Sequence, residues 1–129
     1  MVCVDSDVLI DFLRNKKDVI NKFQEVKNSG QQLSTTSINV FELLVGTSRY
    51  SSIEYDSIKN FLNNFLIYDF DFDSAEKASE IFSDLKSNGQ MIQLPDIMIA
   101  SIVLSNNESL LTRNTNHFEK IKGLDLYTF

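Results

Sequence analysis

Hydrophobic and polar positions change their spacing repeatedly along this chain, and each change marks the boundary of a predicted element. Short apolar runs predict strands, whereas apolar residues that recur every three or four positions predict helices with one buried face. The predicted strands lie at residues 1–5, 33–36, 66–72, 109–112 and 125–129. The predicted helices lie at residues 6–14, 17–28, 37–46, 58–66, 73–88 and 95–104. This alternation indicates an α/β fold with a parallel sheet and helices on both faces.

Residues that favour helix starts predict the first turns of three of these helices. Ser6 or Asp7 is expected to cap the first helix, and Ser37 is expected to cap the third. Asp73 and Glu76 have the spacing of a capping box, which predicts that the fifth helix begins there.

Length and charge limit the possible functions. The 129 residues are expected to form one domain that spans residues 1–129. The net charge of −6 excludes a nuclease that holds a polyanion without the help of a cation. No apolar run approaches the roughly 20 residues of a membrane span, and Asp5 and Asp7 interrupt the N-terminal one, so no signal peptide or membrane anchor is expected. Cys3 is expected to be a buried free thiol, as in a cytoplasmic protein.

Three acidic residues stand in segments that otherwise have the composition of a core. Asp5 follows the apolar run of residues 2–4. Glu42 lies within a largely apolar helix, and Asp96 opens another. A lone buried carboxylate costs several kcal/mol unless it is paired, protonated or bound to a metal ion. The reactive crevice of a parallel sheet lies at the carboxyl ends of its strands, where the three acids and Asn114 are expected to converge.

Each acid also has an ordinary structural explanation. Asp5 and Asp96 fit the first turns of helices, where the helix dipole favours negative charge. Glu42 has the spacing of a capping-box partner for Asn39. The three together need a cation, because carboxylates roughly 4–5 Å apart repel by about 4 kcal/mol per pair at an effective dielectric constant of about 20. An all-oxygen site suits Mg²⁺ or Mn²⁺, and such an ion activates water for hydrolysis of a phosphodiester.

Four segments resemble motifs of PIN-domain nucleases, in the same order and spacing. Residues 4–11 (Val-Asp-Ser-Asp-Val-Leu-Ile-Asp) resemble the opening motif, and residues 42–46 (Glu-Leu-Leu-Val-Gly) resemble a Glu-Leu-x-x-Gly segment. Residues 94–100 resemble the Asp-x-x-Ile-Ala segment, and residues 110–121 resemble the closing Thr-x-Asn/Asp motif with its trailing Phe. The resemblance implies a PIN-like three-layer α/β/α fold with a central, mainly parallel sheet of four or five strands. The compact length is similar to that of VapC-type toxins of prokaryotic toxin–antitoxin pairs.

The resemblance also implies roles for individual residues. Asp5, Glu42 and Asp96 correspond to the metal-binding catalytic acids, and Asn114 stands where many members carry a fourth Asp. The neutral amide of Asn114 can orient water or bind an ion through its oxygen, but it adds no charge. The expected supporting residues are Ser6, Asp7 and Thr112. Ser6 stands in place of a Thr whose hydroxyl helps to orient the first Asp, and Asp7 caps the helix or adds charge. The predicted RNA contacts are Arg14, Arg113, Lys120 and His117.

The function implied by the resemblance is that of a Mg²⁺- or Mn²⁺-dependent endoribonuclease toxin. A metal-activated water would cleave RNA and leave a 5′-phosphate, and a cognate VapB-type antitoxin would neutralise the toxin. The neutral Asn114 leaves open a PIN scaffold that is weakly active or inactive and only binds RNA or protein.

A receiver domain of two-component signalling is a further alternative, but it needs a phosphoacceptor at the end of a buried strand. Asp56 lies in a polar segment, and Arg113 stands where a receiver has Lys.

Aromatic residues are numerous in this chain, with ten Phe and four Tyr. Those near the second to fourth helices belong either to the core or to an exposed groove that binds protein: Phe23, Phe41, Tyr50, Tyr55, Phe61 and Phe65, together with Leu44. The expected assembly is a homodimer whose groove receives an amphipathic helix of the antitoxin. A basic antitoxin side chain, most simply Arg, would then reach the acids and compete with the metal ion.

Overall fold

The computed structural model describes residues 1–47, 52–127 and 129, and its centre is a five-stranded sheet. The strands are β1 (Val2–Val4), β2 (Leu33–Thr36), β3 (Leu66–Tyr68), β4 (Ser109–Leu111) and β5 (Asp125–Tyr127). Their spatial order is β3-β2-β1-β4-β5, and every neighbouring pair is parallel. The predicted α/β fold with a parallel sheet is therefore confirmed, and β1 lies at the middle of the sheet.

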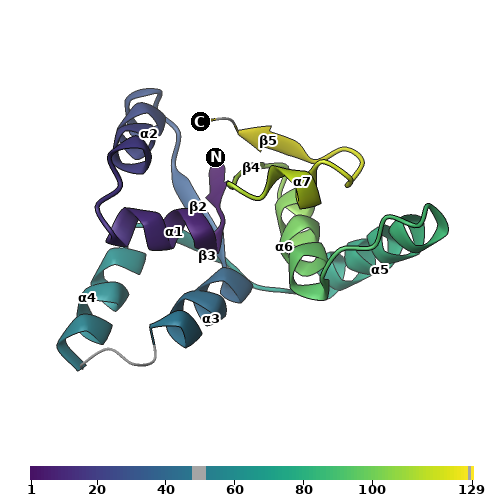
Figure 1. Cartoon of the computed structure of the whole chain (residues 1–129), viewed down its shortest axis with the longest axis horizontal. Helices are drawn as coiled ribbons and strands as arrows, with labels where there is room; N and C mark the ends of the chain where they lie inside the picture. The colour runs from purple at the N-terminus through teal and green to yellow at the C-terminus, as the bar shows by residue number, and fades with distance from the viewer. Residues whose placement is uncertain (48–51, 128) are drawn as a thin grey trace.

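Within the described residues, seven helices connect and cover the strands. They are α1 (Ser6–Leu13), α2 (Lys17–Asn28), α3 (Ser37–Gly46), α4 (Ser52–Leu62), α5 (Phe72–Ser87), α6 (Leu94–Ser105) and α7 (Thr115–Phe118). Figure 1 shows α1, α2 and α4 to one side of the sheet and α5, α6 and α7 to the other. The three layers match the PIN-like architecture. None of the described helices is long and apolar enough to cross a membrane.

The side chains of β1 enter two separate cores, because successive residues of a strand point to opposite faces of the sheet. Val2 and Val4 belong to a hydrophobic cluster that includes Phe23 of α2. Cys3 belongs to the opposite cluster, which includes Ile97 of α6. Cys3 is a buried free thiol, as expected, and burial raises its pKa. The strand that leads to the first acid is thus held from both faces.

The capping residues of three helices differ by one or two positions from the predicted ones. The caps of α1, α3 and α5 are Asp5, Thr36 and Asp71, where the sequence pattern predicts Ser6 or Asp7, Ser37 and Asp73. Asp5 and Thr36 have extended backbones and lead from a strand directly into a helix. Since no loop separates strand from helix, the residue at the strand end also caps the helix. Both side chains therefore lie at the carboxyl edge of the sheet.

Two further differences from the predicted elements lie in the second half of the chain. β3 ends at Tyr68 and not at Phe72, because its neighbour β2 ends at Thr36, which pairs with Tyr68. Phe72 is 78% exposed and begins α5. The polar turn predicted after β4 contains the short helix α7, which carries His117.

Three of the six aromatic residues named near the second to fourth helices pack inside the molecule. Four rings form one cluster with centroids 4.7–6.1 Å apart: Phe12, Phe23, Phe61 and Phe65. The predicted exposed groove is wrong for Phe23 and Phe65, which are buried, and for Phe61 and Leu44, which are partly buried. Phe41 and Tyr55 are 57% and 46% exposed, and Tyr50 lies outside the described residues.

Candidate active site

The carboxyl ends of β1, β2 and β4 carry a polar cluster at one edge of the sheet. Asp5 follows β1, Thr36 ends β2 and Thr112 follows β4. All three side chains are buried. Because β1 lies between β2 and β4, Asp5 is within reach of residues carried by both neighbouring strands.

Asp5 accepts three hydrogen bonds that fix the orientation of its carboxylate. Thr112 Oγ1 donates to Oδ2 at 2.6 Å. Asn39 Nδ2 and the backbone N–H of Ser6 each donate to Oδ1 at 2.8 Å. The donors come from the β4–α7 segment, from α3 and from α1, so three separate parts of the fold set this orientation.

The surroundings of Asp5 disfavour its charged form. Burial is the main cause that raises the pKa of Asp5 to about 7, and the charges of Asp7 and Asp96 act in the same direction. The hydrogen bonds from Thr112 and Ser6 oppose this rise without cancelling it. A cation next to the carboxylate would favour the charged form and lower the pKa again.

Asn39 and Ser6 connect Asp5 to Glu42. Asn39 Nδ2 also donates to Ser6 Oγ at 2.8 Å, and Ser6 Oγ donates to Glu42 Oε1 at 2.7 Å. The capping-box explanation of Glu42 is wrong, because Thr36 caps α3 and the Asn39 side chain contacts Asp5. The hydroxyl of Ser6 orients Glu42, and only its backbone N–H contacts Asp5. Asn39 is fully buried, and it is a site residue that the sequence pattern misses.

Asp96, Asn114 and His117 form a second group on the other side of the site. His117 Nδ1 lies 2.9 Å from Asp96 Oδ2 and 2.9 Å from Asn114 Nδ2. One ring nitrogen cannot donate to Asp96 and accept from Asn114 at the same time, so the imidazole tautomer selects between the two partners. The His117 side chain is 38% exposed, against 15% for Asp96, so the imidazole also faces solvent.

Asp7 ties the first helix to the segment after β4. Its Oδ1 accepts from the N–H of Val8 at 2.7 Å, and its Oδ2 accepts from the N–H of Arg113 at 3.0 Å. Burial raises the pKa of Asp7, and these two hydrogen bonds oppose the rise. The cap of α1 is Asp5 and not Asp7, whose carboxylate adds to the negative charge around Asp5.

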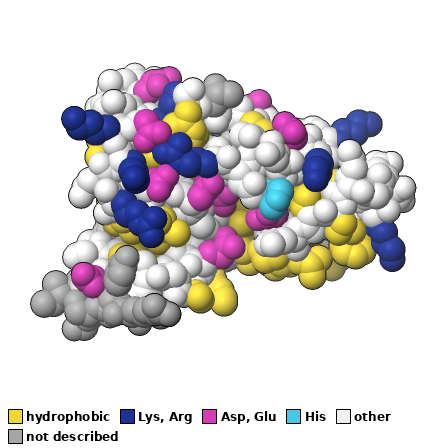
Figure 2. All heavy atoms as spheres, in the orientation of Figure 1, with side chains coloured by type: hydrophobic (Ala, Val, Ile, Leu, Met, Phe, Trp, Pro, Cys, Tyr) yellow, Lys and Arg dark blue, Asp and Glu magenta, His cyan; other side chains and the backbone are white. Residues whose placement is uncertain are grey.

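The residues around Asp5 and Glu42 and the group of Asp96, Asn114 and His117 line one open pocket of about 320 Å³. Its walls are formed by Asp5, Ser6, Asp7, Ile10, Glu42, Gln93, Asp96, Asn114 and His117. All four residues predicted to act in catalysis lie here, with Ile10 and Gln93 as additional lining. Figure 2 shows acidic side chains gathered around the histidine near the middle of this face. The described lining contains four carboxylates and neither Lys nor Arg, so the pocket attracts cations.

The donor atoms in this pocket fit a hard divalent cation. Carboxylate oxygens and the amide oxygen of Asn114 are ligands that Mg²⁺ and Mn²⁺ prefer, and the open pocket leaves room for water. Among the described residues, no three His, Cys, Asp or Glu side chains are already grouped as a metal centre. An ion bound by one or two of these carboxylates would complete its coordination with water.

Comparison with known proteins places the chain in a family. The sequence model of the PIN domain matches residues 2–124. The chain belongs to the PIN domain family. Ribonuclease VapC1 of Methanocaldococcus jannaschii is 30% identical to this PIN domain over 128 residues, which cover 98% of the chain and 86% of the relative. The tRNA(fMet)-specific endonuclease VapC of Shigella flexneri is 25% identical over 123 residues, which cover 94% of the chain and 92% of the relative.

The fold of this PIN domain is also that of a solved toxin–antitoxin component. VapBC2 from Rickettsia felis, bound to a DNA fragment from their promoter, contains a chain that superposes with a TM-score of 0.88. The sequence identity is 23%, and the match covers 100% of this chain and 99% of that one. The predicted PIN-like fold and the resemblance to VapC proteins are thereby confirmed.

Only one of the four predicted RNA contacts of this PIN domain lines the acidic pocket, and that residue is His117. Arg14 is exposed at the end of α1. Arg113 forms ion pairs with Asp11 and Asp18. Lys120 lines a separate pocket of about 510 Å³ beside α5. Binding of RNA by these residues stays a prediction.

Proposed function

We propose that this PIN domain is an endoribonuclease toxin of the VapC type, neutralised by a cognate VapB-type antitoxin. The observation that carries the proposal is the pocket at the strand ends, with its four carboxylates and neither Lys nor Arg in its described lining. Such a site repels RNA phosphates unless a divalent cation bridges them. The relatives named ribonuclease and endonuclease support the same activity.

The metal-binding residues in this proposal are Asp5, Glu42 and Asp96, and the ion is Mg²⁺ or Mn²⁺. When bound, such an ion lowers the pKa of a coordinated water and offsets the charge of the phosphodiester. The chain's own part is to hold the acids in place. Thr112 and Asn39 orient Asp5, and Ser6 orients Glu42. Contacts of this kind, one shell outside the ligands, typically change metal affinity or activity by about 10- to 100-fold.

The group of Asp96, Asn114 and His117 supplies the remaining functions of the site. With its proton on Nδ1, His117 donates to Asp96 and orients the carboxylate. The exposed part of the imidazole is then available to contact an RNA phosphate, as the sequence predicts. Asn114 offers an amide oxygen to water or to the ion without adding negative charge.

The proposed partners are an antitoxin and a second copy of the chain. Phe41 and Val45 of α3 are 57% and 59% exposed, and Leu94 of α6 is 59% exposed. Hydrophobic side chains gather along the lower edge of the face in Figure 2, below the acidic ones. Exposed apolar patches of this kind mark protein contacts. A basic antitoxin side chain that reaches the pocket would pair with its carboxylates and compete with the metal ion.

Cleavage of a mixture of bacterial tRNA and rRNA by the purified protein tests the function. We expect cleavage with Mg²⁺ or Mn²⁺ and none with EDTA. Asp96→Asn should abolish cleavage, because it removes ligand charge while the amide oxygen still accepts from His117. Asp73→Asn, which removes the same charge from the exposed first turn of α5, is the matched control and should retain full activity.

The outcome that contradicts the nuclease proposal is RNA binding without metal-dependent cleavage. That result would favour an inactive PIN scaffold, the alternative that the neutral Asn114 leaves open. Sedimentation of the isolated chain tests whether two copies associate. A monomer at high concentration would contradict the homodimer.

A further inference from the structure

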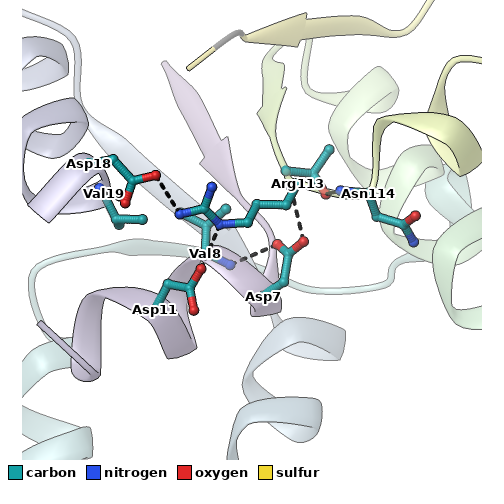
Figure 3. Close-up of polar contacts among 8 residues, drawn as sticks. Asp7, Val8, Asp11, Asp18, Val19, Arg113 and Asn114 are labelled. Atoms are coloured by element: carbon teal, nitrogen blue, oxygen red, sulfur yellow. Dashed lines mark hydrogen bonds and ion pairs between the residues drawn. The ribbon is translucent and has the colours of Figure 1, made fainter. Parts of the chain in front are cut away.

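The side chain of Arg113 turns away from the acidic pocket toward α1 and α2. Its Nε donates to Asp11 Oδ2 at 2.5 Å, and its Nη2 donates to Asp18 Oδ2 at 2.8 Å (Figure 3). The guanidinium carbon lies 4.5 Å from the centroid of the Phe129 ring. The hydrogen bond with Asp18 is the main cause that raises the pKa of Arg113 and lowers the pKa of Asp18. Carboxylates from two helices and one aromatic ring therefore hold the guanidinium.

The backbone around Arg113 carries two residues of the site. Thr112 Oγ1 donates to Asp5 and accepts from the N–H of Asn114 at 3.0 Å. Between them, the N–H of Arg113 donates to Asp7 Oδ2. A shift of residues 112–114 would thus move both the donor that orients Asp5 and the amide that lines the pocket.

Stability alone does not explain the Arg113 contacts. Its side chain is 36% exposed, and exposed ion pairs contribute little to stability. The geometry is more restrictive than the energy, because a planar guanidinium with two engaged N–H groups fixes its distance and angle to both carboxylates. One carboxylate is on α1 and the other is on α2, so the segment after β4 is held against two elements at once.

We propose that Arg113 is a positioning residue that anchors residues 112–114 to α1 and α2 and thereby sets Thr112 against Asp5 and Asn114 at the pocket. This role rests on the proposed ribonuclease function and deepens it. It also replaces the RNA contact that the sequence predicts for Arg113, because Asp11 and Asp18 occupy the guanidinium.

Arg113→Lys separates positioning from contact with RNA. Lysine keeps the charge and still binds phosphate as a point charge, but it has no fork to bridge two carboxylates. With bacterial tRNA as the probe, we expect Arg113→Lys and Arg113→Gln to lower kcat by about 10- to 100-fold and to change KM by less than about twofold. A raised KM in Arg113→Gln, with activity kept in Arg113→Lys and a salt dependence of binding reduced by about one charge, would overturn the proposal.

Hydrogen exchange of the protein without RNA tests the anchoring independently of cleavage. We expect exchange at residues 112–118 to be about tenfold faster in Arg113→Gln than in the wild type. Asp18→Asn should have the same effect in a milder form. It keeps an oxygen that accepts from the N–H of Val19 and replaces the oxygen that accepts from Arg113 with an amide NH₂ group.

Lys22→Gln is the matched control for the exchange experiment. Lys22 also combines an ion pair, 2.9 Å from Glu25, with a ring contact, 5.7 Å from the centroid of Tyr127. Its loss should leave exchange at residues 112–118 unchanged. Unchanged exchange in Arg113→Gln would overturn the anchoring even if RNA is cleaved. If exchange is faster in Arg113→Gln but the wild type cleaves no RNA, the proposed function is overturned and the anchoring is established.

Discussion

At the scale of single residues, the site combines acids that are visible in the sequence with a partner that is not. Asp5, Glu42 and Asp96 interrupt apolar segments, and this contrast is what predicts them. Asn39 carries no such contrast, because a neutral amide in a helix fits many surroundings. Its role depends on the 2.8 Å distance to Asp5, a residue 34 positions earlier, and only the packing of α3 against α1 creates that distance.

The raised pKa of Asp5 predicts that this residue destabilises the metal-free protein above neutral pH. Its pKa is about 7 in the folded protein and about 3.8 in an unfolded chain, so the folded state holds an extra proton between these values. Stability should therefore fall as pH rises from about 4 to about 7. Asp5→Asn should remove this slope and raise the free energy of unfolding at pH 8 by roughly 2–4 kcal/mol.

Urea unfolding in EDTA at several pH values measures both effects of Asp5→Asn. The wild type should gain stability from Mg²⁺ by mass action, and Asp5→Asn should gain much less. An Asp5→Asn protein that is less stable than the wild type at pH 8 would show that the carboxylate stabilises the fold, contrary to the cost of burying its charge.

At the scale of elements, strands and helices follow from the hydrophobic period, but their junctions do not. The predicted and observed bounds agree for α2, β2 and α3 (residues 17–28, 33–36 and 37–46). The caps of α1 and α3 are Asp5 and Thr36, because each strand leads straight into a helix. Propensity favours Ser37 as a cap just as well as Thr36, so the sequence pattern cannot choose between neighbouring residues of the same chemistry.

Thr36→Val should destabilise the protein more than Ser37→Ala does. Thr36 Oγ1 accepts from the N–H of Asn39 and donates to Asn39 Oδ1 at 2.7 Å, so its loss removes a helix cap and frees the asparagine that holds Asp5. The expected cost is about 1–2 kcal/mol, measured by urea unfolding. Ser37→Ala should cost less than about 0.5 kcal/mol. Equal costs for the two variants would contradict the assignment of the cap.

At the scale of the whole molecule, the order of strands and helices predicts a parallel sheet with its site at the carboxyl edge. The structure has both, since Asp5 and Thr112 lie at adjacent strand ends. The surface is less predictable. Phe23 and Phe61 are aromatic residues at helical spacing, as residues of a docking groove would be. They nevertheless stack with Phe12 in the core. Whether an aromatic ring is buried depends on which helices meet, and the period within one helix does not specify that.

Analysis of the RNA ends after cleavage tests the central claim most directly. If acids at the strand ends hold an ion that activates water, the water oxygen joins phosphorus and the 3′ oxygen leaves. The wild type with Mg²⁺ or Mn²⁺ should then give fragments with a 5′-phosphate and a 3′-hydroxyl, and Asp96→Asn should give none. Fragments with a 2′,3′-cyclic phosphate, or cleavage that persists in Asp96→Asn with EDTA, would contradict the account.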